Sequence, residues 1–382
     1  MGVIPDKKKL TFDDNGKFKV CVFSDMHFGE RWGNGSFAAW GPENDNLTNY
    51  VHATILDQEQ PDYVVFNGDI MTGENVFADN ATGYMDQCFR PTVERNLPFS
   101  STHGNHDNAD HITHDEEIKY EMAHYSNLSY TRSDVGPAPY GNGNYWVPVY
   151  ANADDWAPKL IMWFFDSRSF VSGSGDGPGP IPEAADFYWV DPDSVPSYIQ
   201  QQSLLMKLTW GSVPPSLVFV HIPFEFSETI STLQTPGDHD DEPNPAVQGY
   251  AAHQVYTGLD LPTFDAINDC LNEGQNKVMA ITSGHDHGES WCARTRTSSG
   301  ITLCFDGHSG YGGYVTPHSE VRNARIFDLD LNNLNWNPTV ETWLSYENKT
   351  INTQETLGPN FMATYNQSPD WSANILHSTT NE

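Results

Sequence analysis

Residues 62–69 of this chain, Asp62-Tyr63-Val64-Val65-Phe66-Asn67-Gly68-Asp69, decide the fold. The apolar run from Tyr63 to Phe66 has no polar alternation, which is typical of a β-strand covered on both faces. It ends at a glycine followed by a carboxylate. A second run, Phe18–Ser24, ends at Asp25 in a similar way. Strands with polar side chains at their carboxyl ends indicate an α/β sheet with a functional edge.

Strand-like and helix-like segments alternate over most of the chain, and this alternation indicates the α/β class. Further strands are expected at Leu97–Thr102, Leu160–Asp166, Ser216–Val220 and Lys277–Thr282. Helices are expected at Asn46–Leu56, Tyr84–Arg95, His114–Ser126, Ser197–Thr209 and Thr263–Leu271.

The last third of the chain has a different pattern, in which short strands follow one another without intervening helices. They are expected at Ser290–Arg296, Ile301–Phe305, Ala324–Leu329 and Val340–Leu344. This succession predicts a second, more antiparallel sheet. The chain beyond about Ser345 is polar, so we expect one domain over residues 1–345 and a polar C-terminal tail over residues 346–382.

The composition limits the partners of the protein. Among 382 residues, 19 are Lys or Arg and 51 are Asp or Glu, which gives a formal net charge of −32. Such a surface repels polyanions, so long nucleic acid is disfavoured as a partner. No run approaches the ~18 apolar residues that a membrane-spanning helix needs. A phosphate-bearing ligand would have to be attracted locally, and bound divalent metal ions would do this.

Five short motifs, each after a predicted strand, carry side chains that bind metal ions. They are Asp25-Met26-His27, Gly68-Asp69, Gly104-Asn105-His106-Asp107, His221 and Gly284-His285-Asp286-His287. Each motif alone is weak, because a single Asp or His after a strand is more often structural. Five such strand ends in one α/β chain are hard to explain by coincidence. Together they supply enough ligands for two metal ions that share a bridging carboxylate.

Asp69 is the expected bridge, because Gly68 lets the backbone approach a metal site closely. His106 is expected to stabilise the phosphoryl oxygens or to protonate the leaving alkoxide. Asp107 is expected to orient the His106 imidazole. Three further histidines are interpreted as surface residues, at a solvated helix start or on an acidic loop: His111, His114 and His239.

The five motifs together resemble those of the calcineurin-like metallophosphoesterases. The detail is most similar to the fungal and plant phosphatase group related to purple acid phosphatases, in His221-Ile222-Pro223, Trp291-Cys292, and Cys304 followed by Gly307–Tyr314. The resemblance covers roughly Lys17–Leu329. It implies a four-layer α/β/β/α sandwich of two mixed β-sheets, with a dinuclear metal site at the carboxyl ends of the strands.

The resemblance also implies roles for individual residues. One metal ion would be held by Asp25, His27, Asp69 and His287, and the other by Asp69, Asn105, His221 and His285. His308 and Tyr311 would line the substrate pocket. Purple acid phosphatases carry a ferric-iron tyrosine three residues after the bridging aspartate, where this chain has Thr72. The expected cofactors are therefore two divalent or mixed-valence ions among Fe, Mn, Zn, Co and Ni.

These features predict a phosphoesterase that hydrolyses small phosphate esters by attack of a metal-bound hydroxide on phosphorus. Phosphomonoesters, as in acid phosphatases, are the favoured substrates. One alternative is a phosphodiesterase acting on nucleotides, glycerophosphodiesters or nucleic acid. Another is a non-catalytic binding protein with the same fold. The second alternative predicts lost ligand positions, and none is lost.

The sequence also predicts the compartment of the protein. Six Asn-X-Ser/Thr sequons in polar, loop-like or terminal contexts favour a secreted glycoprotein whose signal peptide is not part of this sequence. The sequons begin at Asn34, Asn46, Asn80, Asn127, Asn348 and Asn366. The alternative is a cytosolic protein with incidental sequons.

One disulfide can be predicted from strand register. If Glu289–Arg296 and Ile301–Asp306 form a hairpin centred on Ser298, Cys292 lies directly opposite Cys304 at a spacing that a disulfide can bridge. The first strand contains Cys21, which is expected as a buried free thiol. The pattern leaves open whether the last two cysteines pair with each other: Cys88 and Cys270.

Overall fold

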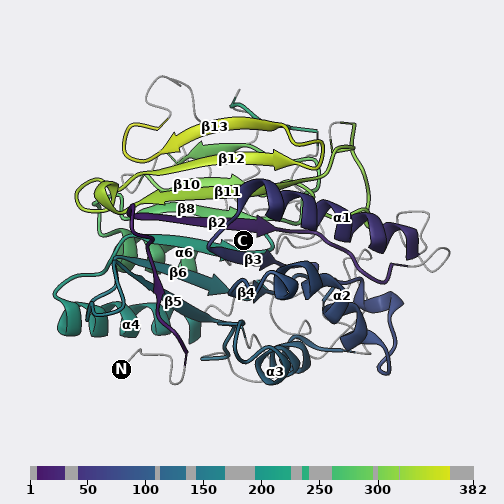
Figure 1. The fold of residues 1–382 in the computed structure, drawn as a ribbon. Helices are drawn as coiled ribbons and strands as arrows, with labels where there is room; N and C mark the ends of the chain where they lie inside the picture. Colours follow the sequence, from purple (N-terminus) through teal and green to yellow (C-terminus); the bar gives the residue numbers. More distant parts are fainter. Residues whose placement is uncertain are drawn as a thin grey trace, which may run out of the picture.

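The computed structural model describes residues 7–30, 42–107, 112–134, 143–167, 194–224, 235–240, 260–295, 300–317 and 319–361. Two mixed β-sheets run through these residues, and helices cover their outer faces (Figure 1). The first sheet, called sheet A, has seven strands in the order β1-β5-β6-β7-β8-β10-β9. The second, called sheet B, has six strands in the order β13-β12-β11-β2-β3-β4.

Sheet A is parallel through its centre and closes with a hairpin. Its strands are β1 (Leu10–Thr11), β5 (Tyr145–Tyr150), β6 (Leu160–Phe165), β7 (Ser216–Val220), β8 (Val278–Ser283), β10 (Thr302–Phe305) and β9 (Cys292–Arg294). Strands β6, β7, β8 and β10 run parallel, so their carboxyl ends share one edge of the sheet.

Sheet B joins a parallel half to an antiparallel half. Its strands are β13 (Ile351–Leu357), β12 (Val340–Tyr346), β11 (Asn323–Asp330), β2 (Lys17–Phe23), β3 (Tyr63–Asn67) and β4 (Phe99–Thr102). The three strands β2, β3 and β4 run parallel, whereas β11 pairs antiparallel with β2. The carboxyl ends of β2, β3 and β4 therefore also share one edge.

The helices form the two outer layers. They are α1 (Pro42–Glu59), α2 (Ala81–Glu94), α3 (His114–His124), α4 (Ser194–Trp210) and α6 (Leu261–Ala266), and α6 continues as the π-helical segment η2 (Ile267–Asn272). Short 3₁₀ turns occur at η1 (Gly73–Asn75) and η3 (Leu331–Asn333). Among the described helices, none combines the length and the apolar character that crossing a membrane would require.

The buried side chains show why four layers form. In β2, Val20 and Val22 pack between the sheets against Phe164 and Phe219 of sheet A. The alternate side chains of β2, including Phe23, instead join α1 and α2 in a separate core. A third core lies between sheet A and the pair α4 and η2. Because strand side chains alternate between faces, both faces of the central strands of each sheet are buried, and the expected α/β/β/α sandwich is confirmed.

Most of the predicted elements are present, with bounds that differ by a few residues. The prediction that the strands of the last third form a sheet of their own is wrong. Strands β9 and β10 extend sheet A beside β8, whereas β11 and β12 extend sheet B beside β2. Strands β1, β5 and β13 were not expected. Strand β13 pairs with β12, so the folded part of the chain continues to Leu357, past the expected boundary at residue 345.

The predicted hairpin and its disulfide are confirmed. Strands β9 and β10 pair antiparallel with Cys304 opposite Cys292, and a disulfide joins these two residues. Cys21 is a buried free thiol, as expected. Cys88 and Cys270 are also free, because α2 and η2 lie on opposite outer layers of the sandwich.

The sequons occupy different local structures. Asn46, Asn127 and Asn348 are exposed, and Asn80 is half-buried. Asn46 lies within α1 rather than in the expected loop-like context. Asn34 and Asn366 lie outside the described residues.

A buried polar network joins the two sheets beneath their shared edge. Asp306, after β10, accepts a hydrogen bond of 2.6 Å from Asn67 Nδ2 at the end of β3. The Thr282 hydroxyl of β8 donates to the other oxygen of Asp306. Burial raises the pKa of Asp306 to about 7, although the hydrogen bonds from Thr282 and Asn67 act in the opposite direction.

We predict that the Asp306 carboxyl makes the protein less stable as the pH rises. Its pKa is about 7 in the folded state and about 3.9 in an unfolded chain, so between these values the folded state holds the extra proton. Stability then falls with rising pH, by up to about 1.4 kcal/mol per pH unit from this group. Asp306→Asn should remove this negative contribution, so the slope of the unfolding free energy against pH, measured by urea titration between about pH 4 and 7, should become more positive than in the wild type.

The exposed Asp14→Asn variant is the control for this experiment, because the side chain of Asp14 faces solvent. It should keep the wild-type slope. A wild-type slope in Asp306→Asn would contradict the assigned role of this buried carboxyl.

Candidate metal centre

The candidate site forms where strand ends from both sheets meet. Sheet B supplies the residues after β2, β3 and β4, and sheet A supplies those after β7 and β8: Asp25, His27, Asp69, Asn105, His221, His285 and His287. None of these side chains is more than 8% exposed. The structure thus brings all seven predicted ligands to one edge of the sandwich.

Four of these residues have a left-handed backbone, which is uncommon for residues other than glycine. Their φ angles are 57° at Asp25, 48° at His27, 49° at Asp69 and 75° at His285. Such conformations cost of the order of 1–3 kcal/mol each and persist only where the surrounding structure holds them. Backbone strain repeated at several strand ends is characteristic of a functional site.

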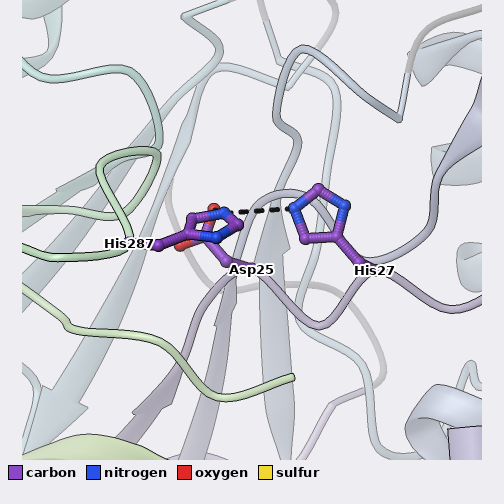
Figure 2. A group of neighbouring side chains, drawn as sticks. All are labelled: Asp25, His27 and His287. Atoms are coloured by element: carbon purple, nitrogen blue, oxygen red, sulfur yellow. Dashed lines mark hydrogen bonds and ion pairs between the residues drawn. The ribbon is translucent and has the colours of Figure 1, made fainter. Parts of the chain in front are cut away.

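The first cluster consists of Asp25, His27 and His287, with ligand atoms all within 4.8 Å of one another. Figure 2 shows the two imidazoles directed at each other, with their Nε2 atoms 3.3 Å apart. Nε2 of His287 also lies 3.4 Å from an oxygen of Asp25. Two imidazole nitrogens and a carboxylate oxygen that converge in this way match the donor set of a borderline metal ion.

The second cluster consists of Asp69, His221 and His285, again with all ligand atoms within 4.8 Å. His221 Nε2 lies 3.1 Å from Asp69 Oδ2, and the same oxygen lies 3.7 Å from His27 Nε2 of the first cluster. Asp69 Oδ2 therefore stands between the two clusters, where a bridging ligand is required.

Two glycines leave the space that these strand ends need to pack against one another. Gly68 has a φ of 87°, and a Cβ at this position would collide with the His221 ring. A Cβ at Gly104 would collide with Asp69 Oδ1 and with the His221 ring. Gly104 directly precedes Asn105, so its lack of a side chain lets the loop that carries this ligand reach Asp69 and His221.

The outer nitrogens of the histidines fix the ring orientation. His221 Nδ1 donates to the Asn67 carbonyl at 2.8 Å, and His287 Nδ1 donates to the Tyr314 carbonyl at 2.8 Å. A carbonyl can only accept, so Nδ1 carries a proton in both rings and Nε2 faces the cluster. Such outer partners orient metal-binding histidines.

The electrostatics of the site favour ligand binding. Burial alone would raise the pKa of Asp69, but the neighbouring His221 imidazole helps to hold it well below its ordinary value. Burial lowers the pKa of both His27 and His285 to about 3, so these rings stay neutral at physiological pH. Burial also lowers the pKa of His221, but the Asp69 carboxylate outweighs this and raises it to about 10. A cation at Nε2 would displace this proton.

The two predicted catalytic residues have different surroundings. The His106 ring centroid lies 5.1 Å from that of His27, and its side chain keeps 9% of its exposure. The prediction that Asp107 orients the His106 imidazole is wrong. Its oxygens instead accept hydrogen bonds from the backbone N–H groups of Gly104, at 2.7 Å, and Met71, at 3.0 Å. Asp107 therefore shapes the loop that carries Asn105.

The two residues expected in the substrate pocket lie next to the site. His308 is fully buried, with its ring 4.0 Å from that of His287 and Nε2 bonded to the Gly312 carbonyl. Tyr311 is half-buried, and its hydroxyl donates to Glu347 at 3.0 Å. Through these contacts both residues stabilise the segments around the site. That either residue contacts substrate stays a prediction.

Sequence reasoning missed one histidine beside the site. His114 is only 3% exposed, which contradicts its expected place on a solvated helix start. Its Nε2 contacts the Gly104 carbonyl at 2.8 Å, and its Nδ1 lies 3.1 Å from the Asp166 carboxylate. One sequence feature could have pointed to this contact. Asp166 follows the apolar strand β6, just as Asp25 follows β2. Nothing local marks His114 as its partner.

The family of the chain follows from comparison with known sequences. The model of the family described as "Calcineurin-like phosphoesterase" matches residues 18–289, a region that contains all seven ligand candidates. The chain belongs to the calcineurin-like phosphoesterases. A dinuclear metal site is typical of this family, and the two clusters that meet at Asp69 are consistent with such a site.

Curated relatives carry names of different kinds. The chain is 27% identical to "Phosphatase DCR2" of Saccharomyces cerevisiae, over 88% of this chain and 55% of that protein. It is also 27% identical to "Probable inactive purple acid phosphatase 14" of Arabidopsis thaliana, over 93% of this chain and 89% of that protein. The chain thus spans about half the length of the yeast relative.

Solved structures with a similar backbone fold include a dimetal phosphatase from Danio rerio. It is 12% identical, covers 89% of this chain and 98% of its own, and has a TM-score of 0.48. The purple acid phosphatase PPD1 from yellow lupin is 10% identical over 92% of this chain and 55% of its own, with a TM-score of 0.46.

We predict that Asp69→Asn loses metal binding. The amide keeps one acceptor oxygen but loses the negative charge, so it cannot bridge two cations. The variant should hold one metal ion or none after dialysis, measured by inductively coupled plasma mass spectrometry. The surface variant Asp57→Asn is the control, because the Asp57 side chain is 69% exposed and pairs with Arg95. If Asp69→Asn kept both ions at wild-type affinity, the bridging assignment would be wrong.

Proposed function

We propose that this protein is a catalytically active, metal-dependent phosphoesterase with a preference for small phosphomonoesters. The observation that carries the proposal is the position of Asp69 Oδ2 between two buried clusters, 3.1 Å from His221 Nε2 and 3.7 Å from His27 Nε2. A site that had lost its chemistry would not be expected to keep every ligand type and a bridge.

The residues fit two metal ions of the borderline class. When bound, such ions neutralise phosphate oxygens and lower the pKa of a water to supply a nucleophile. The chain supplies neutral imidazoles and two carboxylates, which leave net positive charge at the centre for an anionic substrate. Thr72 occupies the position of the purple-phosphatase tyrosine, and its Oγ1 lies 3.0 Å from His27 Nδ1. It orients a ligand there, which argues against an iron–tyrosine centre.

His106 has the features of a proton donor to the leaving group. Its backbone N–H donates to Asp69 Oδ1 at 2.9 Å, so the residue is fixed at the bridge. The residue is 9% exposed, close to the 8% of His285, whereas Asp25 and His221 are fully buried. An imidazole placed there can stabilise the phosphoryl oxygens and then protonate the departing alkoxide.

The rest of the molecule supports a small substrate and an extracellular location. The net charge of −32 disfavours a polyanion, whereas the local charge of bound metal ions would attract a single phosphate group. The Cys292–Cys304 disulfide and the exposed sequon residues Asn46, Asn127 and Asn348 are features of secreted glycoproteins. Secretion and glycosylation at these sites are part of the proposal.

The test is a paired assay on protein reconstituted separately with Mn, Fe, Zn, Co and Ni. Hydrolysis of p-nitrophenyl phosphate faster than that of bis-p-nitrophenyl phosphate, with about two ions bound per chain, would support the proposal. Preference for the diester would identify a phosphodiesterase instead. Two bound ions without activity on either compound would favour a non-catalytic binding protein, as the name of the plant relative suggests.

We predict that His106→Ala lowers kcat by about 10²- to 10⁴-fold, the usual contribution of a positioned acid. Metal content should stay at the wild-type level, because the His106 side chain is not among the expected ligands. The exposed His124→Ala on α3 is the control and should keep wild-type turnover. Wild-type kcat in His106→Ala would remove this residue from the mechanism.

A further inference from the structure

The Gly104 peptide lies at the entrance of the loop that carries Asn105 and His106, and hydrogen bonds hold it on both sides. Its N–H donates to Asp107 Oδ2 at 2.7 Å, within the loop. Its carbonyl contacts His114 Nε2 at 2.8 Å. Because a carbonyl can only accept, His114 Nε2 is the donor of this bond. The loop is thus fixed by a side chain from outside its own segment.

His114 is itself held by a second element. Its Nδ1 lies 3.1 Å from the Asp166 carboxylate, and both side chains are at least 97% buried. Asp166 follows β6 of sheet A, and its backbone N–H donates to Asn144 Oδ1 at 3.1 Å. The imidazole therefore has a carboxylate on one nitrogen and a carbonyl on the other, which fixes both its tautomer and its orientation.

This connection crosses between the two sheets. Gly104 follows β4 of sheet B, His114 is the first residue of α3, and Asp166 follows β6 of sheet A. The metal candidates are likewise divided between the sheets, with Asn105 on the sheet B side and His221 on the sheet A side. A rigid link between the two strand edges keeps these ligands at one spacing.

We infer that Asp166 and His114 form a positioning pair that sets the Gly104–Asp107 loop, and with it Asn105 and His106, against the bridging Asp69. The pair acts through the Gly104 carbonyl, and neither residue belongs to the two candidate metal clusters. This inference rests on the proposed function for its catalytic readout, but its readout of metal binding is independent of activity. Outer residues of this kind typically contribute 10- to 100-fold to metal affinity or activity.

The two amide replacements of His114 separate its two contacts. His114→Gln places an amide nitrogen near the position of Nε2 and can still donate to the Gly104 carbonyl. His114→Asn places its amide near Nδ1, so it keeps the contact with Asp166 and loses the one with Gly104. Thr113→Ala is the matched control, because Thr113 caps α3 in a capping box with Glu116, and its side chain bonds to this helix start rather than to the Gly104–Asp107 loop. It weakens the same helix start without removing the His114 donor.

The measurement is the stepwise binding of Mn²⁺ by calorimetry, together with kcat and KM on p-nitrophenyl phosphate. We expect His114→Asn to weaken one of the two binding steps by about 10-fold or more and to lower kcat with little change in KM. His114→Gln should recover most of both losses, and Thr113→Ala should resemble the wild type. Asp166→Asn should fall between the two His114 variants, because the ring then loses its charged partner.

Two results would overturn the inference. One is wild-type binding of both Mn²⁺ ions by His114→Asn. The other is an equal effect of His114→Asn, His114→Gln and Thr113→Ala, which would show only local destabilisation of α3. If the wild type binds two ions but hydrolyses no ester, the proposed function fails, and the binding data still decide the role of the pair.

Discussion

The site depends on one constraint: Asp69 Oδ2 must lie within reach of histidines from both sheets. His27 approaches it from the end of β2 and His221 from the end of β7, at 3.7 and 3.1 Å. This is possible only because both sheets end their parallel strands at a shared edge of the sandwich. The left-handed backbone at Asp69, with a φ of 49°, is the local cost of the arrangement. The packing of the two sheets around it holds that strained conformation.

The polar network beneath this edge gives the constraint a structural basis. Asn67 ends β3, accepts a hydrogen bond from His221 Nδ1 through its backbone carbonyl, and donates one to Asp306 through its side-chain amide. A single residue thus orients a ligand and joins sheet B to sheet A. The buried Asp306 carboxyl is favoured in its neutral form, whereas Asp69 is held ionised by its imidazole neighbours. Two carboxyl groups close to the same edge therefore have opposite protonation preferences, set by their partners.

Much of this architecture could be predicted from the sequence, because its signals are local. Strand-like runs followed closely by Asp, Asn or His indicate the parallel halves of both sheets and all the ligand candidates. The register of β9 and β10 gives the disulfide, since a hairpin brings together residues close in the chain. The assignment of β11 to a place beside β2 could not be predicted, because nothing in either strand specifies a partner some 300 residues away. Strand β13 was missed because its alternating polar side chains resemble those of a terminal tail.

The errors at the site have a similar cause. Asp107 sits beside His106 in sequence, so a contact between their side chains was expected, but the turn of the loop directs its oxygens to backbone N–H groups. His114 was placed in solvent because it opens a helix rich in acidic residues, yet Asp166 covers it from sheet A. Identity of the ligands can be predicted from strand ends. The side chains that support these ligands come from distant segments of the chain, so they can be identified only once the fold is known.

The most direct test of the account is anomalous diffraction from crystals of the wild-type protein grown with Mn²⁺. The account predicts two peaks about 3.5–4 Å apart, one beside Asp25 and His287 and the other beside His221 and His285, with Asp69 between them. A single peak, or two peaks that do not share Asp69, would contradict the central claim that this carboxylate joins the two clusters into one centre.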